Sequence, residues 1–98
     1  MNVQMKGKVV LITGANSGIG KAAAIKLAQM GAKIVMACRN AIKAEEAKKE
    51  IMYRSGQDEV EIILADFAKQ ADIHALADDF KQKYDKLDVL INNSTVIN

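Results

Sequence analysis

The chain has 98 residues, half of them apolar, a size and composition that suit one small globular domain. Its formal charge is only +2 and its Lys and Arg residues are scattered, which excludes the concentrated basic face that nucleic-acid binding needs. A single cysteine excludes an internal disulfide and a zinc site built on several thiols, and no apolar run approaches the roughly 18 residues of a membrane span. We therefore predict a chain of the reducing cytoplasm.

Hydrophobic patterning predicts strands and helices in strict alternation. Apolar, β-branched runs indicate strands at residues 8–13, 32–37, 60–65 and 88–93. The first shows no alternation, as expected of a strand buried on both faces, whereas the alternation of Glu59, Val60 and Glu61 indicates less burial at the start of the third, as at a sheet edge. Apolar residues at helical spacing indicate helices at residues 18–30, 41–54 and 70–84, and Asn40 is a predicted N-cap of the second. The apolar faces expected to be buried are Ile19, Ala23, Leu27 and Met30 on the first helix, and Ile73, Ala77, Phe80, Tyr84 and Leu87 around the third.

This order predicts an α/β fold with one domain spanning residues 1–98. Alternating strands and helices form a parallel sheet with right-handed crossovers and helices on both faces. We expect a partial Rossmann fold with three α/β/α layers, in which the four strands of the parallel sheet lie in the order 3-2-1-4. A binding pocket is then expected at the carboxyl ends of strands one and four.

A glycine-rich turn joins the first strand to the first helix and reads TGANSGIG from Thr13. Gly14 permits a positive φ in the sharp turn, Gly18 lets the backbone approach a pyrophosphate, and Gly20 lets the helix pack against the strand. An overlapping GxGxxA pattern leaves Gly14 unexplained, so we favour the GxxxGxG interpretation. The GxxxxGK[ST] pattern of phosphate-loop NTPases is absent.

Polar residues follow the other predicted strands. Arg39 follows Cys38, which stands where a dinucleotide fold commonly has an acid for the ribose hydroxyls. A guanidinium binds phosphate, so this pair favours NADP over NAD, the alternative being a surface arginine. Asp66 can accept a hydrogen bond from an adenine amino group or cap a turn, and Asn92 can hold neighbouring backbone or be an ordinary polar residue at a strand end.

Together these motifs resemble the N-terminal part of a short-chain dehydrogenase/reductase, over all 98 residues. The marks are TGANSGIG for the family's TGxxxGxG, Asp66 after the third strand, and Asn92-Asn93 for the first half of its NNAG. The stretch from Ala37 to Asn40 is similar to the NADP-preferring, retinol-dehydrogenase-like branch. The resemblance implies a site for NADP(H) formed by Gly14, Asn16, Ser17, Gly18, Ile19, Gly20, Arg39, Asn40, Asp66, Phe67 and Asn92. In it, Ser17 and Ile19 act through their backbone, Asp66 and Phe67 flank the adenine, and Asn92 lies near the adenine-side ribose.

The chain departs from the family pattern in two places. The NNAG motif reads Asn92-Asn93-Ser94-Thr95, and if its glycine has a positive φ, Thr95 strains the turn by roughly 1 to 2 kcal/mol. The family's catalytic YxxxK is absent: Gln57 stands four residues after Tyr53, and Asp88 four after Tyr84. The resemblance therefore implies no catalytic residue here and no hydride transfer by these residues alone, because the proton donor is missing.

Two alternatives remain. An apolar fourth strand at a sheet edge invites pairing with another chain, so we expect homo-oligomers or marginal stability, and a non-enzymatic nucleotide-sensing or interaction module is the competing function. An S-adenosylmethionine methyltransferase also has a glycine-rich first turn, but Cys38 in place of an acid weighs against it.

Overall fold

The computed structural model describes residues 4–14, 18–66 and 69–92. These residues form the predicted alternation, and every element boundary lies within one residue of its prediction. The elements are β1 (Val9–Thr13), α1 (Gly18–Gln29), β2 (Lys33–Cys38), α2 (Ala41–Ser55), β3 (Val60–Leu64), α3 (Gln70–Lys83) and β4 (Val89–Asn92). None of the helices in this described part is long and apolar enough to cross a membrane.

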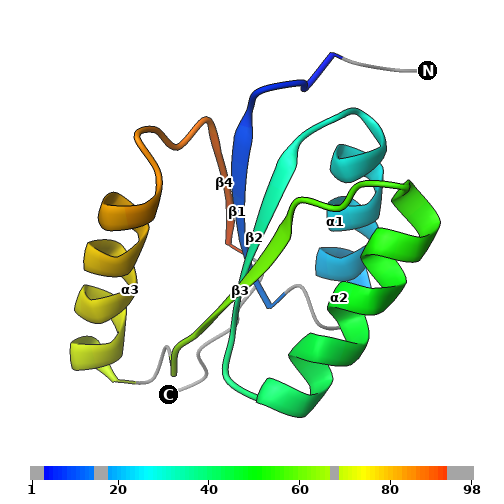
Figure 1. The fold of residues 1–98 in the computed structure, drawn as a ribbon. Helices are drawn as coiled ribbons and strands as arrows, with labels where there is room; N and C mark the ends of the chain where they lie inside the picture. The colour runs from blue at the N-terminus through cyan, green and yellow to red at the C-terminus, as the bar shows by residue number, and fades with distance from the viewer. Residues whose placement is uncertain (1–3, 15–17, 67–68, 93–98) are drawn as a thin grey trace.

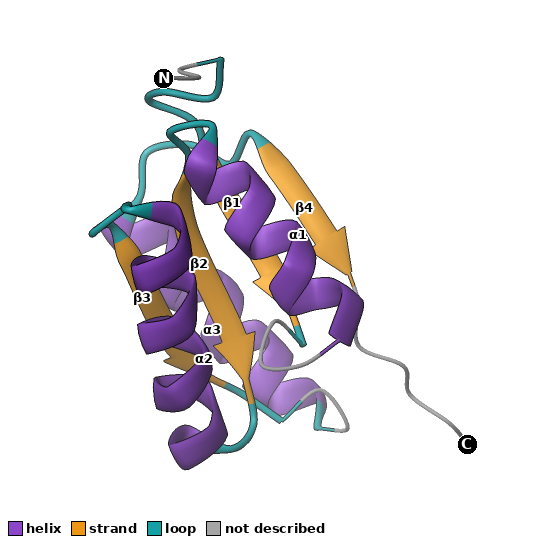
Figure 2. Cartoon of the chain, turned by 90° about the vertical axis from the view of Figure 1, so that its right-hand side faces the viewer, coloured by secondary structure: helices purple, strands orange, loops and turns teal. Residues whose placement is uncertain are grey.

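The four strands form one parallel sheet in the order β3-β2-β1-β4, which confirms the predicted topology. Helices α1 and α2 cover one face of the sheet and α3 covers the other, so the chain has the three predicted layers (Figures 1 and 2). Right-handed crossovers explain the layers. The strands are added in one direction from β1 to β2 to β3, which puts α1 and α2 on one face, and β4 is then added on the opposite side of β1, which puts α3 on the other face.

Two apolar clusters hold the layers together, one on each face of the sheet. Every residue of β1 is buried, which explains why its sequence shows no polar alternation. Alternate residues of β1 and β2 face α1 and α2, where the cluster includes Val10, Ile12, Ile34, Met36, Ala44, Ala47 and Ile51. The residues between them face α3, where the cluster includes Leu11, Val35, Ile63, Leu76, Phe80 and Tyr84.

The predicted apolar face of α1 is right only in part: Leu27 is partly buried and packs against the core cluster. Ile19, expected inside, is 81% exposed, and the helix instead buries Gly20, Ala24 and Ala28. Small residues every four positions let the helix axis lie close to the sheet, whereas the largest apolar residues would hold it away. Gly20 is buried, as expected of a residue that lets α1 pack closely against the sheet.

The predicted face of α3 is right only in part. Phe80 and Tyr84 are buried as expected, but Leu76 replaces Ala77 as the buried residue of the preceding turn. Ile73 and Leu87 are 42% and 43% exposed, since α3 is the only helix on its face in the described part of the chain. Both residues continue the apolar stripe that the sequence predicted, but no described element covers their side chains.

Candidate nucleotide-binding site

The carboxyl ends of all four strands meet at one edge of the sheet. Thr13 of β1 lies opposite Ala37 of β2 and Asn92 of β4, and Cys38 of β2 lies opposite Leu64 of β3. The residues that directly follow the strands therefore gather along this edge. In open α/β sheets, ligands bind at this edge, near the point where the strand order reverses. Here that point lies between β1 and β4.

The glycine turn leaves β1 as predicted. Gly14 has a φ of +69°, a left-handed conformation that favours glycine, and its N–H donates to the Ala37 carbonyl at 3.1 Å. Gly18, at the start of α1, has a φ of +57°, and a Cβ there would meet no atom within 4 Å. The strongly exposed Ile19 follows it. Asn16 and Ser17 lie outside the described residues.

Helix α1 presents its amino end to this edge. Amide groups at a helix N-terminus bind anions, and the first turn of α1 holds no acidic residue to oppose one. The ammonium of Lys21 turns to Glu50 of α2, 2.9 Å away, and Arg54 binds the other oxygen of that carboxylate at 2.9 Å. The Lys21 hydrogen bond is the main cause that lowers the pKa of Glu50. This network joins the two helices and engages the Lys21 ammonium.

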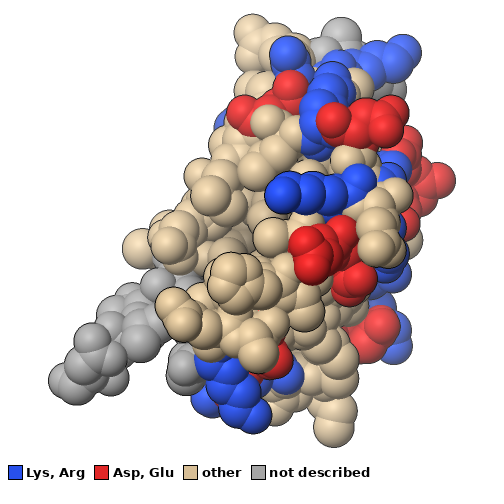
Figure 3. Space-filling model, turned by 90° about the vertical axis from the view of Figure 1, so that its left-hand side faces the viewer, with Lys and Arg blue, Asp and Glu red and all other residues tan. Residues whose placement is uncertain are grey.

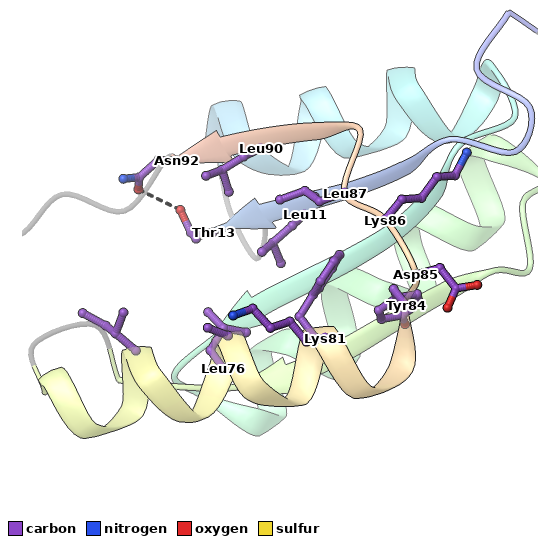
Figure 4. Close-up of a pocket in the computed structure, with 13 residues that line it drawn as sticks. Leu11, Thr13, Leu76, Lys81, Tyr84, Asp85, Lys86, Leu87, Leu90 and Asn92 are labelled. Carbon is purple, nitrogen blue, oxygen red and sulfur yellow. Dashed lines mark hydrogen bonds between the residues drawn. The ribbon is translucent and has the colours of Figure 1, made fainter.

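A hydrogen bond joins the carboxyl ends of β1 and β4 at this edge of the sheet. The buried Thr13 hydroxyl donates to the Asn92 side-chain oxygen at 2.9 Å (Figure 4). The sequence suggested that Asn92 holds neighbouring backbone, and it did not reveal that Thr13 and Asn92 bind each other across 79 positions. The bond fixes the end of β4 against the strand that carries the glycine turn. The predicted role of Asn92 near a ribose stays a prediction.

Arg39 and Asn40 follow β2. Arg39 is exposed, and none of the ion pairs in the described ranges includes it. The Asn40 side-chain oxygen accepts from the Lys43 N–H at 3.0 Å, which confirms Asn40 as the N-cap of α2. The cap fixes where α2 begins and so where Arg39 stands. Cofactor contacts of either side chain stay predictions.

The segment after β3 is held by a residue that sequence reasoning missed. The Asp66 N–H donates to a carboxylate oxygen of Asp72 at 2.9 Å, and the Ala65 N–H donates to the Cys38 carbonyl at 2.9 Å. The only sequence signal for this contact was the acidic residue in the first turn of α3, where Asp72 lies. Asp66 is half-buried at the same edge as Arg39. Phe67 lies outside the described residues.

Comparisons with known proteins agree with this geometry. The family model described as short chain dehydrogenase matches residues 8–98. Retinol dehydrogenase 11 of Mus musculus is 45% identical over 96 residues, which are 98% of this chain and 30% of that protein. Retinol dehydrogenase 12 of Homo sapiens is 43% identical over 96 residues, with the same coverage of each chain. The chain thus spans about a third of the length of the curated relatives it matches.

A solved structure provides a comparison in three dimensions. The RhlG/NADP active-site complex of Pseudomonas aeruginosa superimposes with a TM-score of 0.85 at 26% sequence identity. The match covers 96% of this chain and 37% of that one. The described sheet and helices therefore have the arrangement found in a protein that was crystallised with NADP.

Proposed function

The chain belongs to the short-chain dehydrogenase family, and from this we propose that its 98 residues form the NADP(H)-binding part of an oxidoreductase. One observation carries the proposal: the left-handed glycine turn and the exposed Arg39 lie at the same edge of the sheet. The amino end of α1 offers backbone amides to a pyrophosphate, and Arg39 offers a guanidinium to a further phosphate.

The preference for NADP over NAD rests on Arg39 and on what surrounds it. Position 38, at the end of β2, is a buried cysteine and not an acid, so β2 ends without a carboxylate to bind ribose hydroxyls. Arg39 has no ion-pair partner among the described residues, which leaves its planar group open to a 2′-phosphate. The likeness to a protein crystallised with NADP supports the same cofactor.

A charge reversal at Arg39 tests the cofactor preference. We expect Arg39→Asp to weaken NADPH binding at least about tenfold and to leave NADH binding unchanged or stronger, because the carboxylate repels a 2′-phosphate and accepts from ribose hydroxyls. Lys49→Asp makes the same change of charge on the exposed side of α2 and is the matched control. Calorimetric titration with both nucleotides measures the ratio of the NADPH and NADH dissociation constants. An equal ratio in the wild type and in Arg39→Asp would contradict the role of Arg39.

We propose that these residues bind the cofactor without transferring hydride. No YxxxK occurs in the 98 residues, so a carbonyl substrate has no tyrosine to protonate it. A mixture of the chain, NADPH and all-trans-retinal, the aldehyde suggested by the names of the relatives, is expected to keep its absorbance at 340 nm. Oxidation of NADPH above the rate without protein would contradict this part of the proposal.

The second candidate is a non-enzymatic module that senses a nucleotide or associates with itself, located in the cytoplasm. The exposure of Leu90 on β4, an outer strand of the sheet in the described part of the chain, favours it, since an apolar edge promotes pairing between chains. Titration with NADPH, NAD and S-adenosylmethionine separates the candidates. Binding of none of the three would favour the interaction module, and binding of S-adenosylmethionine would contradict both candidates.

A further inference from the structure

Asp66 lies in the short segment that joins β3 to α3, at the edge of the sheet where the cofactor is proposed to bind. Leu64 is the last residue of β3, and the N–H of the next residue, Ala65, donates to the Cys38 carbonyl at 2.9 Å. Asp66 comes directly after this bond and is half-buried. A buried backbone N–H needs a hydrogen-bond partner, and the Asp66 N–H finds its acceptor in α3.

Both backbone groups of Asp66 are held by residues at the start of α3. Its N–H donates to a carboxylate oxygen of Asp72 at 2.9 Å, and its carbonyl accepts from the Lys69 N–H at 3.0 Å. A residue that is bound at its N–H and at its carbonyl loses most of its freedom in φ and ψ. The direction of its Cα–Cβ bond is then fixed as well, and with it the point from which the Asp66 carboxylate extends.

The Asp72 carboxylate reaches farther back than an acid at its position usually does. Lys69 is the N-cap of α3 and makes no side-chain cap hydrogen bond, and Asp72 is the third residue of the helix. An acid at the third position commonly accepts from the N–H of the N-cap residue. Here the Lys69 N–H donates to the Asp66 carbonyl, and Asp72 accepts from Asp66, three residues before the N-cap. Asp72 thus anchors the chain as it leaves β3, in addition to its favourable charge at the amino end of α3.

Asp66 and Arg39 lie at the ends of neighbouring strands. Cys38 of β2 lies opposite Leu64 of β3, so Arg39 follows one of two paired strand ends and Asp66 follows the other. In NADP the adenine and the 2′-phosphate are attached to the same ribose, so a phosphate bound by Arg39 brings the adenine near Asp66. Seen from the α3 side, basic and acidic side chains gather at the end of the molecule where α3 begins (Figure 3). Such an edge suits a ligand that carries both phosphates and a hydrogen-bond-donating base.

We propose that Asp72 is a positioning residue of the NADP(H) site. By accepting from the Asp66 N–H, Asp72 holds the Asp66 carboxylate where it accepts a hydrogen bond from the adenine amino group. Asp72 acts through Asp66 and does not itself bind the cofactor. The inference rests on the cofactor binding proposed above and adds to it that the preference for adenine depends on the first turn of α3.

The base of the nucleotide provides a measurement that is specific to this role. Reduced nicotinamide hypoxanthine dinucleotide phosphate has a carbonyl oxygen where NADPH has the adenine amino group, so it cannot donate to a carboxylate there. We expect the 98-residue chain to bind NADPH roughly tenfold more tightly than this analogue in calorimetric titrations, because the analogue lacks a hydrogen bond to a charged group. A variant that is merely less stable binds both nucleotides less well and leaves the ratio of the two dissociation constants unchanged.

Two substitutions at Asp72 separate the hydrogen bond from the charge. Asp72→Ala removes the acceptor and is expected to reduce the ratio of the two dissociation constants to about twofold or less. Asp72→Asn removes the charge but keeps a side-chain oxygen that accepts hydrogen bonds, so it is expected to retain most of the ratio. Asp78→Ala removes an exposed acid farther along α3 and is the matched control, for which we expect the wild-type ratio.

The outcomes distinguish this inference from the cofactor proposal. A wild-type ratio near one, a wild-type ratio in Asp72→Ala, or equal losses in Asp72→Ala and Asp72→Asn would each overturn the role of Asp72, and NADPH binding by the wild type would leave the cofactor proposal intact. If the wild type does not bind NADPH, both proposals are wrong.

A variant at Asp66 does not depend on the folding of Asp72→Ala. Asp66→Ala keeps the backbone N–H that Asp72 accepts from and removes the carboxylate that is proposed to bind adenine. We expect it to lower the ratio of the two dissociation constants as far as Asp72→Ala does. A wild-type ratio in Asp66→Ala would overturn the inference, because Asp72 would then hold a residue that does not read the base.

Discussion

Gly18 and Gly56 share a left-handed backbone and open surroundings but lie in different places. Their φ angles are +57° and +75°, and a Cβ at either position would meet no atom within 4 Å. Gly18 begins α1 at the candidate site, whereas Gly56 is the C-cap of α2. Alanine at either position therefore introduces backbone strain without a clash, and only the location differs.

This pair separates the effect of strain from the effect on binding. We expect Gly18→Ala and Gly56→Ala each to lower the free energy of unfolding by about 1 kcal/mol, because both force alanine into the left-handed region. Only Gly18→Ala is expected to weaken NADPH binding as well, since its turn positions the amides of α1. Urea denaturation and fluorescence titration measure the two quantities. Equal binding by both variants would contradict a role of Gly18 at the cofactor site.

At the scale of elements, Asp88 ties β4 to the start of β1. Its carboxylate accepts from the Val9 N–H at 2.8 Å and lies 3.5 Å from the ammonium of Lys86 and 4.0 Å from that of Lys8. The Val9 hydrogen bond is the main cause that lowers the pKa of Asp88, and the two lysines add to it. Folding thus favours the ionised carboxyl at the amino ends of β1 and β4.

The lowered pKa predicts how stability depends on pH. A carboxyl whose pKa falls on folding stabilises the protein fully above its unfolded pKa, about 3.9, and loses that contribution as pH falls through the folded pKa. Asp88→Asn is therefore expected to be less stable than the wild type at about pH 6, with a difference that shrinks toward about pH 3. Urea denaturation across this range measures the difference. Asp85→Asn, an exposed neighbour, is the control, and a difference that stays constant with pH would refute the account.

Elements were easier to predict than contacts, for a physical reason. The strand and helix boundaries follow from local signals such as the glycine turn, the Asn40 cap and apolar periodicity, and the strand order follows from the handedness of the crossovers. The buried face of α1 was predicted only in part because close packing selects Ala24 and Ala28 over larger residues, a choice set by the distance of the helix from the sheet. The bond from Thr13 to Asn92 depends on strands 79 residues apart, which no local pattern encodes.

The sheet, in the part of the chain that the structure describes, is covered unequally on its two faces. On one face, α1 and α2 enclose a cluster in which Ile51 is fully buried. On the other face, α3 is the only helix among the described residues, and Leu76 lies at the wall of an apolar groove between α3 and β4 with 7% of its surface exposed. Removing side-chain atoms from an enclosed site leaves a cavity, whereas removing them beside an open groove lets water or neighbouring side chains fill the space.

Equivalent truncations on the two faces should therefore differ in cost. We expect Ile51→Ala to lower the free energy of unfolding by about 4 kcal/mol and Leu76→Ala by about 2 kcal/mol, the upper and lower parts of the range for such changes. Both remove the same number of carbon atoms, so the difference reports how each site closes after truncation. Urea denaturation, at protein concentrations low enough to keep the chain monomeric, measures both values. If Leu76→Ala costs as much as Ile51→Ala, then the α3 side is as tightly enclosed as the α1–α2 side, and the groove is not an open surface in solution.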